Sequence, residues 1–157
     1  MYFCSNQTKF ALMTPFVHQI TAYSPALEEA FARLMPQLSP RLGGVDRLRI
    51  EQILSSEHTA LFSAEDGGRI VGLLTLVWYD VPSGRKAWVE DVVVDAEARG
   101  CGAGRALVAA AEERSAQIGA AKLMLTSSAH RTAARALYRK MGFEEAATTV
   151  FAYNNKQ

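Results

Sequence analysis

The feature that most constrains this chain is a glycine-rich turn, Arg99-Gly100-Cys101-Gly102-Ala103-Gly104, between an apolar run and an amphipathic segment. The apolar run Val92-Val93-Val94 predicts the end of a buried strand, and Leu107, Val108 and Ala111 recur at helical spacing after the turn. Glycine adopts positive φ without a steric penalty and lets other groups approach the backbone closely. The sequence therefore predicts a strand, a tight turn and a helix in direct succession.

The first amides of that predicted helix have no intrahelical acceptor, and the helix dipole favours negative charge beside them. Arg99 and Arg105 add positive charge on either side of the glycines. A pyrophosphate fits such a site. The same glycines could also form a tight turn with no ligand. A dinucleotide-binding fingerprint needs a further glycine where Leu107 stands, and its strand–helix–strand unit should open the domain.

Periodicity and turn residues predict the order of the other elements. Strands are expected at residues 16–22, 59–64, 70–79, 87–94, 122–126 and 148–153, and helical segments at residues 25–34, 48–54, 102–117 and 131–141. Pro36, Pro40 and Gly43-Gly44 are expected to end the first helix. This order predicts an α/β fold with a mixed, mostly antiparallel central sheet flanked by helices. Residues 16–157 are read as one domain, and residues 1–15 as an N-terminal extension.

Composition narrows the class of protein. Hydrophobic residues make up 49% and charged residues 21% of 157 residues, and the formal net charge is +1. These values are typical of a globular domain, and they favour neither a nucleic-acid partner nor a membrane surface. Two cysteines and three scattered histidines indicate no disulfide framework and no metal site. A cytoplasmic location is the simplest expectation, and homodimerisation stays open.

Two motifs resemble the GCN5-related N-acetyltransferase (GNAT) family. The turn contains Arg99-x-x-Gly102-x-Gly104, which is similar to the family's pyrophosphate motif, and Glu90-Asp91-Val92-Val93-Val94 precedes it in the position of the family's fourth strand. Ala136-Leu137-Tyr138-Arg139-Lys140-Met141-Gly142-Phe143 resembles the family's second common motif. The likeness extends from about Phe16 to Tyr153 in the order of strands and helices. It implies the acyl-CoA N-acyltransferase fold.

The resemblance implies acetyl-CoA as the acetyl donor. In the family two parallel strands part, and the pantetheine arm lies between them; here these strands would end at Val94 and span Lys122 to Thr126. Main-chain groups of Val92 and Val94 would bond the pantetheine amides, and main-chain amides of the turn would hold the pyrophosphate. The implied cofactor-binding residues are Val92, Val93, Val94, Arg99, Gly100, Cys101, Gly102, Ala103, Gly104, Arg105 and Arg131.

The chemistry implied is direct attack by a primary amine on the thioester carbonyl. A base must first take a proton from the ammonium form, and an acid can protonate the departing thiolate. By resemblance Tyr138 is the acid. Glu90 or Asp91 is the base, since a charged residue in an apolar strand is costly unless it is used or paired. Adjacent residues point to opposite faces of a strand, and Glu90, expected on the face of Trp88 and Val92, is preferred. A bulge beside the thioester is common in the family, so strict alternation along the strand does not decide between the two.

One position departs from the family pattern. Seven residues before Tyr138 the family often has asparagine, whereas this chain has Arg131, which could serve the cofactor's phosphates or cap the helix. The acceptor pocket implied by the resemblance involves Gln37 to Asp46, Trp78-Tyr79 and Thr148 to Tyr153. These segments do not identify the acceptor: a small amine and a peptide N-terminus fit equally well. The alternative function is a non-catalytic acyl-CoA-binding regulatory domain.

Overall fold

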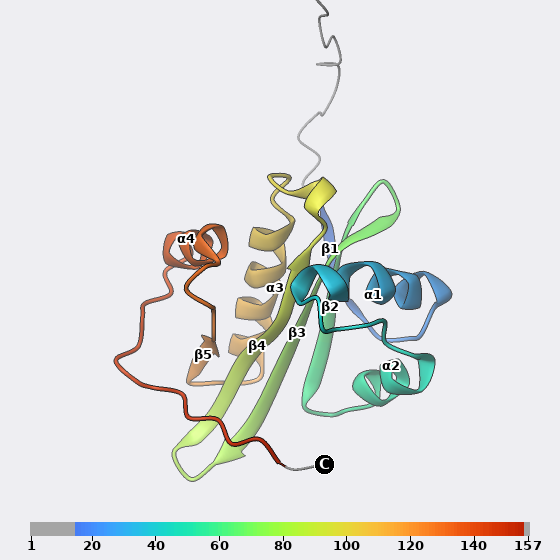
Figure 1. Ribbon diagram of the computed structural model, residues 1–157. Helices are drawn as coiled ribbons and strands as arrows, with labels where there is room; N and C mark the ends of the chain where they lie inside the picture. Colours follow the sequence, from blue (N-terminus) through green and yellow to red (C-terminus); the bar gives the residue numbers. More distant parts are fainter. Residues whose placement is uncertain (1–14, 156–157) are drawn as a thin grey trace, which may run out of the picture. The chain divides into compact units, whose positions relative to one another are not determined.

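The computed structural model describes residues 15–155, which form two compact units divided after Thr126. The first unit contains one five-stranded sheet in the order β1-β2-β3-β4-β5 (Figure 1). Its elements are β1 (Phe16–Ile20), α1 (Pro25–Leu38), α2 (Arg47–Leu54), β2 (Thr59–Asp66), β3 (Arg69–Val81), β4 (Gly84–Val94), a 3-10 turn η1 (Ala96–Ala98), α3 (Ala103–Gln117) and β5 (Lys122–Leu125). The second unit contains α4 (Thr132–Lys140).

The first four strands pair antiparallel with their sequence neighbours, and β5 pairs parallel with β4. Short turns join β2 to β3 and β3 to β4, and both turns contain glycine at positive φ. A parallel pair cannot be joined by such a hairpin, so α3 supplies the crossover from β4 to β5. The predicted mixed, mostly antiparallel sheet is thereby confirmed.

Helices α1 and α2 cover one face of the sheet, and α3 covers the other (Figure 1). Alternation along the strands separates the two faces: Leu61, Leu73 and Val93 pack with α1 and α2. On the opposite face, a Cβ atom at Gly72 would lie 3.0 Å from Leu107 of α3. The central strands are therefore covered on both faces, and β2 and β3 each contain consecutive buried residues, which explains the long apolar run of β3.

Two expectations about local structure are wrong. Helix α1 does not break at Pro36 but continues to Leu38, and Ala32, whose carbonyl loses its helical partner to the proline, is exposed to solvent. Residues 148–153 form no strand. Their residue types favour β structure, but a strand needs a partner for its backbone hydrogen bonds, and the described part of the second unit contains none.

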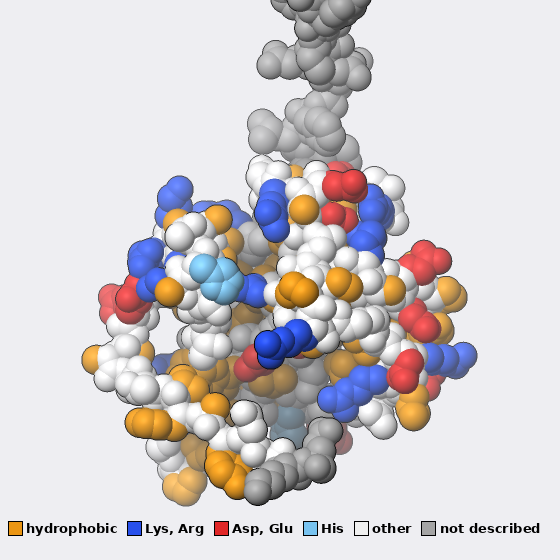
Figure 2. All heavy atoms as spheres, in the orientation of Figure 1, with side chains coloured by type: hydrophobic (Ala, Val, Ile, Leu, Met, Phe, Trp, Pro, Cys, Tyr) orange, Lys and Arg blue, Asp and Glu red, His pale blue; other side chains and the backbone are white. Residues whose placement is uncertain are grey.

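Among residues 15–155, no helix combines the length and the apolar character that a membrane crossing requires. On the face of the molecule shown in Figure 2, Lys and Arg side chains are interspersed with Asp and Glu side chains. That distribution agrees with the formal net charge of +1. The single-domain assignment of residues 16–157 stays a prediction, and residues 1–14 of the expected extension lie outside the described part.

Candidate active site

The glycine-rich turn forms the predicted junction between strand and helix. Strand β4 ends at Val94, η1 follows, and α3 begins after Gly102. Gly100 and Gly102 have φ values of 82° and 87°, a region that residues with a Cβ atom rarely adopt. Their conformation, and not only their small size, therefore requires glycine at both positions.

The outer side of this turn is open. Among residues 15–155, nothing lies within 4 Å of a Cβ atom built at Gly100 or Gly102, and no side chain caps the start of α3. The first-turn amides of α3 consequently lack both an intrahelical acceptor and a side-chain acceptor. Arg99 and Arg105 are exposed and form no hydrogen bond or ion pair with any residue in the described range. An anion could thus approach bare amides flanked by two available cations.

Cys101 contributes less than the other residues of the turn. Its amide already donates to the Ala98 carbonyl at 3.4 Å, and its half-buried thiol is free. The remaining amides, from Gly102 to Arg105, are those best placed to hold an anion.

Strand β5 ends earlier than its neighbour β4. Their pairing begins at Lys86 with Lys122 and ends at Val89 with Leu125, the last residue of β5, whereas β4 continues to Val94. The β5 side of β4 from Glu90 onward therefore has no strand partner within the described residues. Backbone groups of Val92 and Val94 lie on this free stretch, while Val93 is buried against α1. All four residues of β5 pair with β4, so this free stretch arises where β5 ends, and the parting that the resemblance implies stays a prediction.

A bulge in β4 places the two candidate bases. The register passes from Val93 opposite Leu73 to Glu90 opposite Thr75, so β4 contains one extra residue, and Asp91 has a φ of 50°. Because the extra residue interrupts the alternation, Glu90 shares the α1-side face with Trp88 but not with Val92. Both carboxylates are solvent-accessible. Desolvation and, to a smaller extent, the charge of Asp91 raise the pKa of Glu90.

An aromatic pair lies on the same face as Glu90. The Trp88 indole Nε1 donates to the Tyr79 hydroxyl at 3.0 Å, and Tyr79 is 42% exposed. Trp78, expected at the acceptor pocket with Tyr79, is instead buried on the α3 face, where the Arg114 guanidinium lies 5.8 Å from its ring centroid. Adjacent strand residues point to opposite faces, so only one of the pair could lie beside Glu90. Trp88, and not Trp78, lies on the same face as Tyr79 and Glu90.

The second unit holds Tyr138 on α4. The tyrosine is half-buried, its ring centroid lies 5.9 Å from that of Phe143, and its carbonyl accepts hydrogen bonds from Met141 and Phe143 at the end of the helix. Burial raises the pKa of the Tyr138 phenol, against the opposing effect of the Arg131 charge. Tyr138 therefore retains its proton at neutral pH, as a general acid must.

Arg131 occupies the N-cap position of α4, but its side chain makes no capping hydrogen bond. The helix-capping alternative is therefore wrong. Arg135 and Arg139, one and two turns further along, both bond to Glu145.

Sequence reasoning assigned no role to Asp95, which the structure buries to 2% exposure at the start of η1. Its Oδ1 accepts the Glu97 amide at 3.2 Å, and Oδ2 pairs with the Arg33 guanidinium. An aspartate just before a short helical turn is a recognisable N-cap signal, so its local role could have been predicted. Its partners on α1 lie about sixty residues earlier, and no local pattern indicates them.

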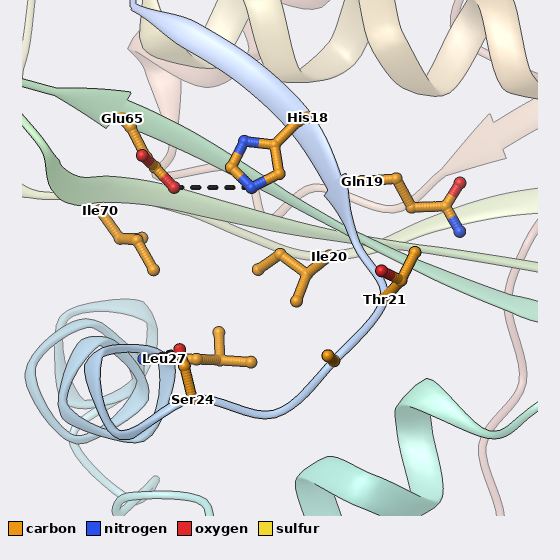
Figure 3. A pocket seen from close by; sticks show the side chains of 9 residues that line it. His18, Gln19, Ile20, Thr21, Ser24, Leu27, Glu65 and Ile70 are labelled. Carbon is orange, nitrogen blue, oxygen red and sulfur yellow. Dashed lines mark hydrogen bonds and ion pairs between the residues drawn. The ribbon is translucent and has the colours of Figure 1, made fainter.

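A separate pocket of about 250 Å³ lies at the β1 edge of the sheet (Figure 3). His18 Nε2 and Glu65 Oε1 face each other across it at 3.6 Å, and Ile20, Leu27 and Ile70 supply apolar walls. No residue that the sequence predicted for the site lines this pocket. It is distinct from the glycine-rich turn.

Known proteins are similar to this chain in sequence or in fold. An uncharacterized N-acetyltransferase, YhfO, of Bacillus subtilis (strain 168) is 33% identical over 94 residues, which cover 59% of this chain and 63% of YhfO. The alignment thus spans less than two thirds of that relative. A crystal structure described as a transcriptional regulator from Bacillus halodurans C-125 is 25% identical, with a TM-score of 0.73 over 88% of this chain and 100% of that one.

A third similarity shows the fold alone. The aminoglycoside N-acetyltransferase AAC(6')-Iy, in complex with CoA, is 22% identical, with a TM-score of 0.73 over 90% of this chain and 95% of that one. Residues 24–143 match the family described as Acetyltransferase (GNAT) family, and this range includes the turn, both carboxylates and Tyr138. The chain therefore belongs to the GNAT acetyltransferase family.

Proposed function

We propose that the chain is an N-acetyltransferase that moves an acetyl group from acetyl-CoA to a primary amine by direct attack. The observation that carries the proposal is the open glycine-rich turn beside the unpaired stretch of β4. A pyrophosphate would occupy the amides from Gly102 to Arg105, with Arg99 and Arg105 as counter-charges. Amide-containing pantetheine would bond the free backbone of Val92 and Val94. Arg131 would add a contact to a phosphate group.

In the proposed reaction Glu90 takes a proton from the substrate ammonium, directly or through water. The amine nitrogen then bonds to the thioester carbon, and the oxygen of the tetrahedral intermediate accepts a hydrogen bond from a main-chain N–H group of β4. As the intermediate collapses, the carbon–sulfur bond breaks, Tyr138 gives its proton to the sulfur, and the second proton lost by the nitrogen restores the Tyr138 phenol, directly or through water. The products are the acetylated amine and free CoA. The AAC(6')-Iy complex supports the proposal, because a protein of the same fold binds CoA.

The acceptor is proposed only as an amine of unidentified class, a small amine or a peptide N-terminus. Tyr79 and Trp88 offer an aromatic surface on the face that holds Glu90. A screen of amines that monitors release of free thiol would identify the acceptor. Homodimerisation is a separate proposal, and the mass of the particle in solution tests it.

We expect CoA to stabilise the chain. A ligand that binds only the native state adds roughly 2.7 kcal/mol at a hundredfold excess over its dissociation constant, so thermal unfolding should shift upward on titration. NAD and ATP serve as comparison ligands. If either of them shifted unfolding and CoA did not, the acetyltransferase proposal would fail.

A second function, a non-catalytic acyl-CoA-binding regulatory domain, is favoured by one observation. The similar Bacillus halodurans structure is described as a transcriptional regulator. The two functions differ in one measurement: a regulatory domain would bind CoA but release no thiol from acetyl-CoA with any amine tested. Thiol release dependent on an amine would exclude this alternative.

Two isosteric substitutions should distinguish the candidate bases. Glu90→Gln removes the proton acceptor and should lower kcat/KM by ~10²-fold or more, a usual contribution of one general base. Asp91→Asn should preserve the backbone, since asparagine tolerates the positive φ at this position. It also removes a charge that raises the pKa of Glu90, so that pKa should fall.

A base acts when deprotonated, so the acid limb of the kcat/KM profile should move to lower pH in Asp91→Asn while activity at higher pH persists. The profile of the unaltered chain should show this limb above the usual range of a glutamate. The reverse pattern, with Glu90→Gln active and Asp91→Asn inactive, would assign the base to Asp91.

A further inference from the structure

Side chains of helix α1 contact the turn that precedes the glycines. The buried carboxylate of Asp95 lies at the junction of β4 and η1, where its amide donates to the Val71 carbonyl at 2.8 Å and its carbonyl accepts the Ala98 amide at 2.9 Å. These backbone bonds begin the turn. They do not explain why a charged group should be buried there, because a buried carboxylate is costly unless it is paired and hydrogen-bonded.

Helix α1 supplies the pairing. Arg33 donates to Asp95 through Nη1 and to the Ile70 carbonyl through Nη2 at 2.7 Å, so one guanidinium joins the end of β4 to the start of β3. One turn later, Gln37 uses both ends of its amide: Oε1 accepts the Ala96 amide at 2.9 Å, and Nε2 donates to Asp95 Oδ1 at 3.4 Å. Arg69 adds a more distant contact to Asp95 Oδ2 at 3.5 Å.

These groups keep Asp95 charged. Burial alone would raise the pKa of the carboxyl group, but the Glu97 amide, the Gln37 amide group and Arg33 together hold that pKa below its ordinary value. A buried ion pair is weak evidence for stability, since apolar residues of similar size often serve as well. The charged arrangement instead fixes the path of the backbone after β4. It defines where η1 begins, and η1 leads directly into Arg99 and Gly100.

We propose that Asp95 and Gln37 are positioning residues that hold the glycine-rich turn in the geometry needed by the pyrophosphate of acetyl-CoA, with helix α1 as their support. This inference rests on the proposed function. Neither residue would touch the ligand. They would act through the orientation of the turn from Ala96 to Arg99, so that the amides that follow need no rearrangement when the anion binds.

Gln37→Ala provides the sharpest test, because Gln37 is exposed and its loss leaves the buried Asp95–Arg33 pair in place. Asp95→Ala would leave the Arg33 guanidinium without its carboxylate partner, and the variant could fail to fold. The matched control is Glu29→Ala, two turns earlier on α1, where an exposed side chain makes no hydrogen bond or ion pair with any residue between 15 and 155. Dissociation constants for CoA and for pantetheine, which lacks the phosphates, are measured for each chain, together with thermal unfolding.

We expect Gln37→Ala to weaken CoA binding roughly fivefold or more, in line with the loss of one or two hydrogen bonds. Pantetheine affinity should match that of Glu29→Ala, and the unfolding midpoint should fall slightly below that of Glu29→Ala because the hydrogen bonds of Gln37 are lost. Unchanged CoA affinity in Gln37→Ala would overturn the inference, and so would an equal loss for CoA and pantetheine. Failure of the unaltered chain to bind CoA would instead overturn the proposed function, and this inference with it.

Discussion

Replacement of Tyr138 by phenylalanine is expected to lower turnover by ~10²-fold or more while CoA affinity stays nearly unchanged, the usual effect of losing one general acid. The ring of Tyr138 contacts Phe143, and phenylalanine preserves that packing. Only the hydroxyl, whose pKa burial raises, is lost. Steady-state kinetics with acetyl-CoA, together with a CoA titration, separate turnover from binding.

The matched control for this variant is Tyr23→Phe. It makes the same chemical change at a hydroxyl that donates to Glu28 on α1 at 2.6 Å and has no part in the proposed reaction. Tyr23→Phe should retain full turnover even if it lowers the unfolding midpoint slightly. Unchanged turnover in Tyr138→Phe would remove Tyr138 from the mechanism, and a parallel loss of CoA affinity would reassign it to binding.

Replacement of Gly102 by valine is expected to weaken CoA binding at least tenfold, or about 1.4 kcal/mol. Two effects act together. A branched side chain would project into the open space through which a phosphate approaches, and a φ of 87° is strongly disfavoured for a β-branched residue. The dissociation constant of CoA, measured by calorimetry, reports the combined effect.

Gly119→Val isolates the second effect. Gly119 also has a positive φ, 72°, with nothing within 4 Å of an added Cβ atom, and it follows the other end of α3. Both variants should lose a similar amount of stability in thermal unfolding. Only Gly102→Val should lose CoA affinity. Equal CoA affinity in the two variants would contradict the assignment of the turn as the pyrophosphate site.

Features that depend on neighbouring residues agree with the prediction, and features that depend on distant residues do not. The glycine-rich turn, the strand before it and the helix after it were predicted, because positive φ and helical periodicity depend on residues a few positions apart. The predictions for Pro36 and for residues 148–153 are wrong for the complementary reason. Proline's cost depends on whether the freed carbonyl reaches solvent, and strand formation depends on a partner that may lie anywhere in the chain.

The sequence by itself determined which residues carry the chemistry: the open glycine turn with its arginines, the adjacent carboxylates Glu90 and Asp91, and the tyrosine of the α4 motif. Tertiary structure decided how the turn is used. Pairing between β3 and β4 creates the bulge that places Glu90 and Val92 on opposite faces of the sheet, and the early end of β5 leaves the backbone of Val92 and Val94 unpaired. Contacts from α1 then hold the turn through Asp95. Each of these features joins segments distant in the chain, and interactions of that range leave no local pattern from which to predict them.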